Sequence, residues 1–448
     1  MLGISRPKNI STKQQYIAKL ASESPKMTFT SLAYHIDTQW LHEAYRRTRK
    51  AAAPGVDGQT ANEYVQNLDA NLESLLGRFK SGCYRAPPAR RVKIPKGDGT
   101  SRKLGLPTFE DKILQRAVAM LLEPVYEQDF QDASHGFRPS RSCHTALASL
   151  WEGTMRMHGG WMLEVDVEDF FGTVDHSHLR DFLDRRVRDG VVRRAIDKWL
   201  GAGVIEKGRH VRSSSGTPQG GVLSPMLANI YLHEVIDRWF EEDVKPRMKG
   251  ACLEIRYADD MVFVFAKRSD AERVMNVLAK RLDRFGLRLH PTKSRISDFR
   301  RPRSPWFGTR DNSQGKTRAF VFLGFTHYWA LSAKGRRTQV IKRKTSSKSF
   351  SRALKRVSEY CRRNRHVPVG VQYKVLCRKI QGHYAYFGIT GNGKALERFQ
   401  KAIHPIWAKW LSRRNLRALA TKFTNFVLLQ QRYAFPPPRV VHSIYAVK

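Results

Sequence analysis

The segment Arg256-Tyr257-Ala258-Asp259-Asp260 separates two short apolar runs, Cys252 to Ile255 and Met261 to Phe265. Apolar residues on both sides of a short polar break predict a hairpin whose tight turn projects both carboxylates. Such a pair can hold divalent metal ions, because Mg²⁺ takes oxygen ligands and leaves positions open for substrate phosphates. For an isolated Asp-Asp pair a solvated hairpin tip is the favoured interpretation, so residues elsewhere in the chain must decide.

The overall charge favours a polyanionic partner. The 448 residues include 80 Lys and Arg against 40 Asp and Glu, a formal net charge of +40. Nucleic acid is the first candidate, since each phosphate neutralised by Lys or Arg releases a counterion. A membrane surface is the weaker one, because no apolar run reaches the ~20 residues that span a bilayer and the N-terminus lacks the apolar core of a secretory signal. We therefore expect no membrane partner.

The cysteines favour a reducing compartment. They are scattered and odd in number, without a Cys-x-x-Cys pair, which argues against a structural zinc site or a disulfide framework. The five are Cys83, Cys143, Cys252, Cys361 and Cys377. We expect a cytoplasmic protein.

A basic hairpin is predicted between residues 89 and 107, where two alternating segments flank a Gly-Asp-Gly turn. Arg90, Lys96 and Arg102 recur every six residues along it. These cations could simply face water. They could also bind a triphosphate, because Arg and Lys donors offset its charge and align the leaving group.

Two further segments are candidates for chemistry. Asp166 stands in a mainly apolar strand that begins at Trp161, where an unpaired carboxylate is costly unless a cation compensates it, although a sheet-surface position is the commoner reading. Gly216 to Pro225 is a glycine-bearing loop that opens an apolar helix, with Ser224 as a candidate N-cap. Glycines there let the backbone come close to a ligand.

The C-terminal quarter is strongly basic. Residues 331–448 hold 27 Lys and Arg against two Glu, a balance of +25 that is more than half of the net charge. Aromatic residues interleave with these cations at helical spacing, which predicts basic helices over an aromatic core, as nucleic-acid binding requires.

Several motifs, taken in chain order, resemble those of reverse transcriptases. The order is Asp166, Pro218-Gln219-Gly220, Tyr257-Ala258-Asp259-Asp260, Lys293 and Phe322-Leu323-Gly324. Within that superfamily other segments resemble group II intron-encoded reverse transcriptase/maturases. They are Ala53 to Gly58, Ile94-Pro95-Lys96, Leu104 to Pro107, His135 to Pro139 and Gly216 to Pro225. The resemblance covers nearly the whole chain.

The resemblance implies an α+β fold of the right-hand polymerase type, with fingers, a palm built on an antiparallel sheet, a helical thumb and a basic C-terminal helical region. The implied domains are an N-terminal extension with the start of the fingers (1–85), fingers and palm (86–330), a thumb or maturase domain (331–400) and a DNA-binding region (401–448).

The resemblance also assigns a metal site. Asp166 and Asp259 would bind two Mg²⁺ ions, with Mn²⁺ as an alternative, while Asp260 completes the acidic turn and the Val167 carbonyl is a candidate extra ligand. The acids Glu164, Glu168 and Asp169 depart from the family pattern and leave assignments beyond Asp166 open.

The implied substrate contacts surround these acids. Phe171 would exclude a 2′-hydroxyl, with core packing as the alternative that we assign to Phe170. Gln219 would contact the incoming nucleotide, and Lys293 would approach from a following turn. The complete substrate-binding set is Arg90, Lys96, Arg102, Phe171, Pro218, Gln219 and Lys293.

The expected function is an RNA-directed DNA polymerase that binds its group II intron RNA, assists splicing and copies that RNA during retrohoming. Its partners would be intron RNA, an RNA template with a DNA primer, target DNA and deoxynucleoside triphosphates, with a homodimer left open. No paired Cys or His-Asn-His pattern follows the basic end, which implies the endonuclease-lacking type. The alternatives are a related polymerase of DNA repair or anti-phage defence, and a nonenzymatic RNA-binding splicing cofactor.

Overall fold

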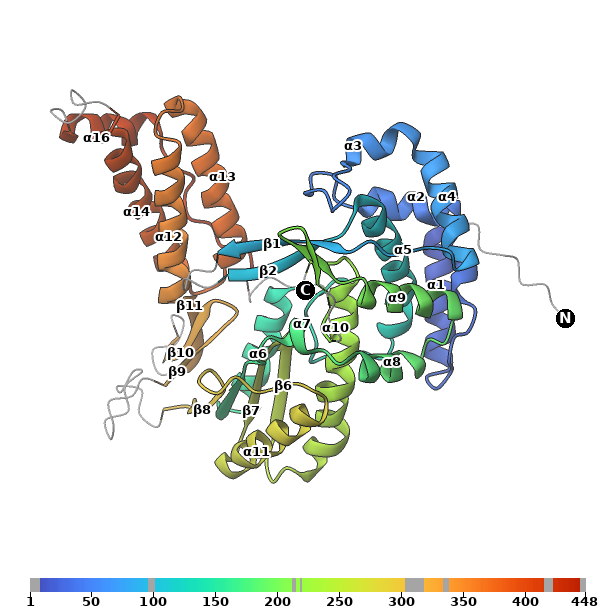
Figure 1. Ribbon diagram of the computed structural model, residues 1–448. Helices are drawn as coiled ribbons and strands as arrows, with labels where there is room; N and C mark the ends of the chain where they lie inside the picture. The colour runs from blue at the N-terminus through green and yellow to red at the C-terminus, as the bar shows by residue number, and fades with distance from the viewer. Residues whose placement is uncertain are drawn as a thin grey trace. The chain divides into compact units, whose positions relative to one another are not determined.

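The computed structural model describes residues 9–95, 101–211, 215–217, 220–302, 318–332, 338–414 and 422–443. The chain forms two compact units, and each is described by itself. The first comprises residues 1–146 and 163–296, and the second comprises residues 147–162 and 297–448. Figure 1 labels their helices and strands.

The first unit is mixed helix and sheet. Its helices in the N-terminal half are α1 (Ile10–Glu23), η1 (Leu32–His35), α2 (Thr38–Arg47), α3 (Ala61–Tyr64), η2 (Val65–Asn67), α4 (Leu68–Ser81) and α5 (Phe109–Tyr126). Those that follow are α7 (Phe170–Thr173), α8 (His176–Asp184), α9 (Gly190–Gly201), α10 (Ser224–Leu232), η3 (His233–Asp237), η4 (Phe240–Val244), η5 (Lys245–Arg247) and α11 (Arg268–Arg284).

Two four-stranded sheets belong to this unit. One has the order β2-β1-β4-β5, formed by β1 (Ala89–Pro95), β2 (Ser101–Leu106), β4 (Val204–Glu206) and β5 (Arg209–Val211). The other has the order β6-β7-β3-β8, formed by β3 (Trp161–Val165), β6 (Cys252–Tyr257), β7 (Asp260–Phe265) and β8 (Arg295–Asp298). The antiparallel pairing of β1 with β2 and of β6 with β7 confirms both predicted hairpins.

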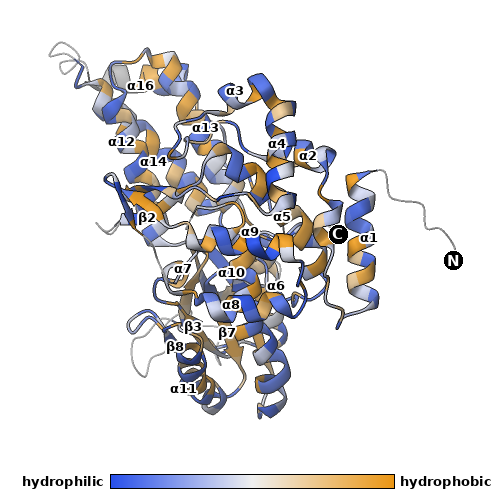
Figure 2. Cartoon of the chain, turned by 45° about the vertical axis from the view of Figure 1, so that its right-hand side comes forward, coloured by the Kyte–Doolittle hydropathy of each residue, from blue (hydrophilic) through white to orange (hydrophobic). Residues whose placement is uncertain are grey.

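Helix α5 is the core of the first unit. Thr108 caps it by accepting a hydrogen bond from the Asp111 amide, and its side chains are buried around most of the circumference. A helix that is apolar on most sides is buried by its neighbours, here α1 and α2. The strands β3 and β7 are likewise hydrophobic along their length, as Figure 2 shows in orange.

The second unit combines a small antiparallel sheet with a helical bundle. Its strands, in the order β11-β10-β9, are β9 (Ala319–Phe322), β10 (Phe325–Leu331) and β11 (Gln339–Thr345). Its helices are α12 (Ser347–Arg363), α13 (Val369–Phe387), α14 (Gly393–Leu411) and α16 (Lys422–Arg432), and α6 (Cys143–Arg156) crosses into it at residue 147.

The bundle has the aromatic core that the sequence predicts. Helices α12, α13 and α14 lie side by side (Figure 1) around Trp407, which is fully buried. Phe435 returns from the C-terminal segment to pack on Trp407 and on Tyr373. Basic residues cover the outer side of α12, which is amphipathic with Val357 and Cys361 buried.

Some local predictions are wrong in detail. The apolar residues between Ser31 and Tyr45 have the spacing of one amphipathic helix, but the segment is broken into η1 and α2, because Asp37 caps α2 through the Trp40 amide. The apolar run from Phe320 to Phe325 predicts a single strand but forms a hairpin, since Leu323 and Gly324 both take positive φ angles of 47° and 79°. Leu223, not Ser224, precedes the first residue of α10.

The expected helical C-terminal quarter also contains a strand. β11 lies within residues 331–400, and α14 is continuous through residue 400. The domain boundaries at residues 85, 330 and 400 remain predictions. Over the described ranges, no helix combines the length and apolar character needed to cross a membrane.

A buried acid in α5 predicts a pH-dependent stability. Burial raises the pKa of the Asp111 carboxyl from 3.8 to about 7, although Trp199 donates a hydrogen bond to it. Because the folded-state pKa is raised, the stabilising contribution of the protonated form is complete below pH ~4 and is lost as the pH rises through about 7.

Asp111→Asn keeps the acceptor for Trp199 but does not ionise. Between pH 5 and pH 7.5 we expect the wild type to lose ~2–3 kcal/mol of unfolding free energy relative to this variant, measured by urea titration. Asp181→Asn, which removes an exposed carboxylate on α8, is the control. If the difference in unfolding free energy between wild type and Asp111→Asn were the same at pH 5 and at pH 7.5, the prediction would be contradicted.

Candidate active site

The acidic turn is the tip of the β6–β7 hairpin. Tyr257 pairs with Asp260, so Ala258 and Asp259 form a two-residue connection. Ala258 takes a φ of 56°, a left-handed conformation that costs a residue with a Cβ about 1–2 kcal/mol. The predicted tight turn is therefore present, with Asp259 at its tip and Asp260 opening β7.

Asp166 lies directly after β3, the strand next to β7 in the sheet order. The segment 288–294 holds its backbone: His290 N–H donates to the Asp166 carbonyl over 2.8 Å, and the Ser294 hydroxyl lies 3.3 Å from its amide nitrogen. Val167 forms an isolated antiparallel bridge with Leu289. Asp166 O and Glu168 N make the hydrogen bonds of that bridge, which therefore does not use the Val167 carbonyl.

The carboxylates are close enough to perturb one another. Burial, then the charges of Asp259 and Asp166, raise the pKa of Asp260 to about 6. Burial and the Asp166 charge also raise the pKa of Asp259. Part of Asp260 is open to solvent, but the protein mass around its carboxylate still excludes enough water to disfavour the charged form. The site has an excess of negative charge that a cation would relieve.

Two basic side chains partly compensate these acids. Lys293 Nζ lies 3.3 Å from Asp166 Oδ1, so the predicted approach of this lysine is present. The charge of Arg102, on β2, lowers the pKa of both Asp259 and Asp260. Both cations are therefore placed to act on a phosphate held at the carboxylates.

Arg90 is engaged elsewhere. Its guanidinium donates to the Pro54 carbonyl at 2.8 Å and 3.1 Å, and Lys112 donates to the neighbouring Ala53 carbonyl. Arg90 thus holds the turn at residues 53–58 onto β1. Its proposed contact with a triphosphate remains a prediction, and Lys96 lies outside the described residues.

Phe171 lies beside the start of the glycine loop. It is partly exposed, whereas Phe170 is buried to 2% exposure, in line with the core role expected for Phe170. Thr217 N–H donates to the Phe171 carbonyl over 2.8 Å. Gly216 has a φ of 87° and no room for a side chain, since an added Cβ would lie 2.9 Å from that carbonyl. Pro218 and Gln219 follow directly but lie outside the described residues.

The additional acids near Asp166 have other contacts. Glu164 pairs with Arg295 on β8, with an Oε1 to Nε distance of 2.8 Å. Glu168 and Asp169 are exposed, and Asp169 directly precedes α7 with a φ of 42°. In the described part of the chain, none of these three additional acids makes a hydrogen bond or an ion pair with the three aspartates or with Lys293.

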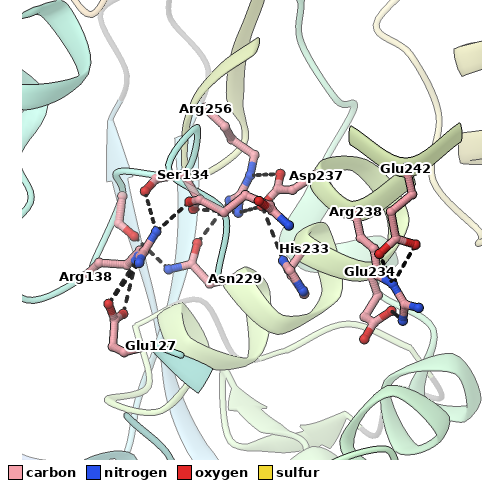
Figure 3. Close-up of polar contacts among 12 residues, drawn as sticks. Glu127, Ser134, Arg138, Asn229, His233, Glu234, Asp237, Arg238, Glu242 and Arg256 are labelled. Carbon is pink, nitrogen blue, oxygen red and sulfur yellow. Dashed lines mark hydrogen bonds and ion pairs between the residues drawn. The ribbon is translucent and has the colours of Figure 1, made fainter. Parts of the chain in front are cut away.

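Behind the turn lies a buried polar network (Figure 3) centred on Arg256. Arg256 and its partner Asp237 are both fully buried, and Nε lies 2.6 Å from the Asp237 carboxylate. The same guanidinium donates to Asn229 Oδ1 at 3.0 Å, to the Ser134 hydroxyl at 2.7 Å and to the Ala258 carbonyl at 3.2 Å. All five of its N–H groups thereby have acceptors.

The loop at residues 134–138 belongs to this network. Asn229, which accepts from Arg256 through Oδ1, donates through Nδ2 to the Gly136 carbonyl over 2.7 Å. Gly136 packs directly on the turn, because a Cβ there would lie 2.4 Å from the Ala258 nitrogen. Arg138 is 7% exposed and donates to Glu127 and to the Ser134 carbonyl. The turn is thus supported from behind by both α10 and this loop.

Sequence reasoning missed most of this network. Arg256 was recognised only as a neighbour of the acids, and Asn229 and Asp237 were not singled out. One signal was available: eight residues separate Asn229 from Asp237 in a mainly apolar helical segment, so both fall on the same side at helical spacing. Buried polar groups of this kind require partners, which the sequence alone does not name.

The three aspartates fit a magnesium site in which substrate phosphates complete the coordination. Within the described parts of the chain, no three His, Cys, Asp or Glu side chains gather as a ready-made ion cage. Mg²⁺ commonly binds through one or two carboxylates plus substrate phosphates, and the pKa values of Asp259 and Asp260 are raised by burial first and by neighbouring acid charge second, both of which a bound cation would oppose. The donor set suits a metal that arrives with its substrate.

Comparison with known proteins assigns the family. Residues 94–327, about half of the chain, match the model for reverse transcriptase (RNA-dependent DNA polymerase). The chain belongs to the reverse transcriptase family. The matched region contains the β6–β7 hairpin, Asp166 and Lys293.

The relatives include group II intron proteins. Protein YkfC of Escherichia coli K12 is 36% identical over 57% of this chain and 75% of its own length. The group II intron-encoded protein LtrA of Lactococcus lactis is 38% identical over 54% of this chain but 42% of its own length. Nuclear intron maturase 2 of Arabidopsis thaliana is 28% identical over 40% of this chain and 31% of its own length. Two of these three relatives have names that refer to introns.

The packing of Gly136 on the turn gives a direct test. Gly136→Ala places a Cβ 2.4 Å from the Ala258 nitrogen, so the turn or the loop must shift. Since a displacement of about 1 Å costs on the order of 10²-fold in rate, we expect primer extension on an RNA template to fall at least ~10-fold.

Gly77→Ala is the matched control. Gly77 lies in α4, where an added Cβ meets nothing within 4 Å. It should leave the extension rate unchanged and stabilise the chain by up to ~1 kcal/mol, because alanine favours helix more than glycine. Equal extension rates for the two variants would show that Gly136 does not position the turn.

Proposed function

We propose that this chain is an RNA-directed DNA polymerase that also binds group II intron RNA, assists its splicing and reverse transcribes it during retrohoming. The observation that carries the proposal is the set formed by Asp166, Asp259 and Asp260 beside Lys293 and Arg102, within a chain of the reverse transcriptase family. Such a site needs no nucleophilic side chain, because phosphoryl transfer depends mainly on alignment and charge stabilisation.

The proposed domain arrangement is that of a right-hand polymerase. The sheet β6-β7-β3-β8 would be the palm, the sheet with β1 and β2 would belong to the fingers, and the bundle α12 to α14 would be the thumb. The α16 region would contact target DNA. The support is the order of the elements along the chain, together with the placement of the acids at one end of the palm sheet.

Asp166 and Asp259 would hold the catalytic ions, with Asp260 and the Val167 carbonyl as further oxygen donors. Two bound Mg²⁺ ions lower the pKa of a primer 3′-hydroxyl and stabilise the leaving pyrophosphate, and Mn²⁺ could replace them. The negative charges of Asp259 and Asp260 repel one another, so binding of a cation beside them is favourable.

The remaining site residues would orient the nucleotide. Lys293, which lies against Asp166, would neutralise charge at the reacting phosphate, and Arg102 would bind the triphosphate. Phe171 would pack against the sugar and exclude a 2′-hydroxyl, next to the loop that leads to Pro218 and Gln219. Arg90 and Lys96 would complete the triphosphate contacts.

Binding of intron RNA would use the second unit. Its helices combine a buried aromatic core with a large excess of Lys and Arg, so the cations are left for phosphate contacts. The relatives whose names refer to introns and maturases support this part. Retrohoming would add target DNA as a partner.

Two other functions remain candidates. A related polymerase of DNA repair or anti-phage defence would have the same active site without an intron partner. A nonenzymatic splicing cofactor would have no use for these three carboxylates, two of which have their pKa raised by burial and by neighbouring acids. The presence of intron RNA sequences flanking the coding region would separate the first alternative from the main proposal.

A double substitution tests polymerase and maturase functions together. Asp259→Ala with Asp260→Ala should reduce primer extension on an RNA template at least ~10³-fold, because charge stabilisation at the transferred phosphate is lost. The same variant should still promote splicing of the flanking group II intron at near-physiological salt, since RNA binding does not need these acids.

Glu241→Ala with Glu242→Ala, on exposed positions of η4, is the control for removing two acids elsewhere. It should retain both activities. Normal extension by the Asp259 and Asp260 variant would refute the polymerase function. A wild-type protein that extends primers but leaves intron splicing unchanged would refute the maturase function alone.

A further inference from the structure

Phe137 is an exposed aromatic residue that none of the assigned roles uses. It lies between Gly136 and Arg138, and 55% of its surface is open to solvent. Its backbone has a φ of 57°, a left-handed conformation that a bulky residue rarely adopts. An isolated exposed apolar side chain needs no explanation, but one held in a strained conformation does.

The neighbours of Phe137 fix its position. On one side the Gly136 carbonyl accepts a hydrogen bond from the buried Asn229. On the other, the buried Arg138 guanidinium donates to Glu127 and to the Ser134 and Gln131 carbonyls. Gly136 and Arg138, which are both held by hydrogen bonds, therefore impose the strained backbone at Phe137. The Phe137 ring itself is little buried.

This arrangement places the Phe137 ring beside the catalytic turn. Its centroid lies 6.3 Å from that of Tyr257, with the planes inclined by 38°, and Tyr257 is two residues from Asp259. Together the two rings form an aromatic surface, which we call the Phe137–Tyr257 ledge. The ledge lies beside the acidic turn, where the 3′ end of the primer must lie during extension.

We propose that the Phe137–Tyr257 ledge binds the terminal nucleotide of the primer strand by stacking against it. The inference rests on the proposed polymerase function. Bases of any sequence offer an aromatic face, so stacking suits a site that must accept every primer end. The incoming nucleotide is the less suitable occupant, because its proposed contact is Phe171, whose carbonyl accepts a hydrogen bond from Thr217 at the start of the glycine loop.

Phe137→Gly is the most informative variant, because glycine adopts the positive φ without strain. If the ring served folding, this change would lower the melting temperature; if it serves the primer, the melting temperature should stay equal or rise. We expect its Kd for an RNA template with a DNA primer to increase on the order of 10-fold, within the range expected for one lost stacking contact. Phe137→Tyr should restore binding to within about 3-fold of wild type.

Abasic residues in the primer or in the template show which nucleotide occupies the Phe137–Tyr257 ledge. An abasic residue at the primer terminus should reduce the difference between wild type and Phe137→Gly, whereas an abasic residue opposite it in the template should not. Val277→Ala, an exposed apolar change on α11, should behave as wild type.

Three results would overturn the inference. Phe137→Gly could bind primer–template as tightly as wild type, or Phe137→Tyr could bind as weakly as Phe137→Gly. The difference in Kd between wild type and Phe137→Gly could also disappear only when the abasic residue is in the template. If the wild type extended no primer at all, the proposed polymerase function itself would fail, which is a separate outcome.

Discussion

The buried ion pair between Arg256 and Asp237 is the interaction on which the acidic turn depends. A charge that is removed from water is strongly destabilising unless it is paired and fully hydrogen-bonded, and here every donor of the guanidinium has an acceptor. The acceptors come from α10 and η3, from the loop at Ser134 and from the turn itself. One side chain thereby fixes three segments that are far apart in the sequence.

This constraint explains how strained backbone persists at the site. Ala258 and Phe137 both have left-handed φ angles, and each lies next to a residue that the network holds. Conformations of this kind survive only where the surroundings over-determine them. Glu254, which is buried on β6, has its pKa raised well above 4.5 by burial and by the Asp237 charge. The geometry that presents the carboxylates is therefore maintained from the interior.

Much of the fold and of the site was predictable from the sequence. Alternating apolar residues identified both hairpins, and the order of motifs brought Asp166, Lys293 and the acidic turn into one hypothesis, as the structure places them. The network was not predictable, because the pairing of Arg256 with Asp237 depends on how a helix packs behind a sheet. The helix break at Asp37 and the strand turn at Leu323 were not predictable, because a local cap and positive φ angles override the hydrophobic periodicity.

The central claim is that the buried network positions the catalytic turn, and Asp237→Asn tests it most directly. This change keeps the shape of the side chain but removes the charge that faces Arg256. Single-turnover addition of one nucleotide, measured at saturating primer–template, should slow at least ~10-fold because the turn moves. Amide exchange should increase at residues 257–260 but not in α11. A folded variant that adds nucleotides at the wild-type rate would contradict the account.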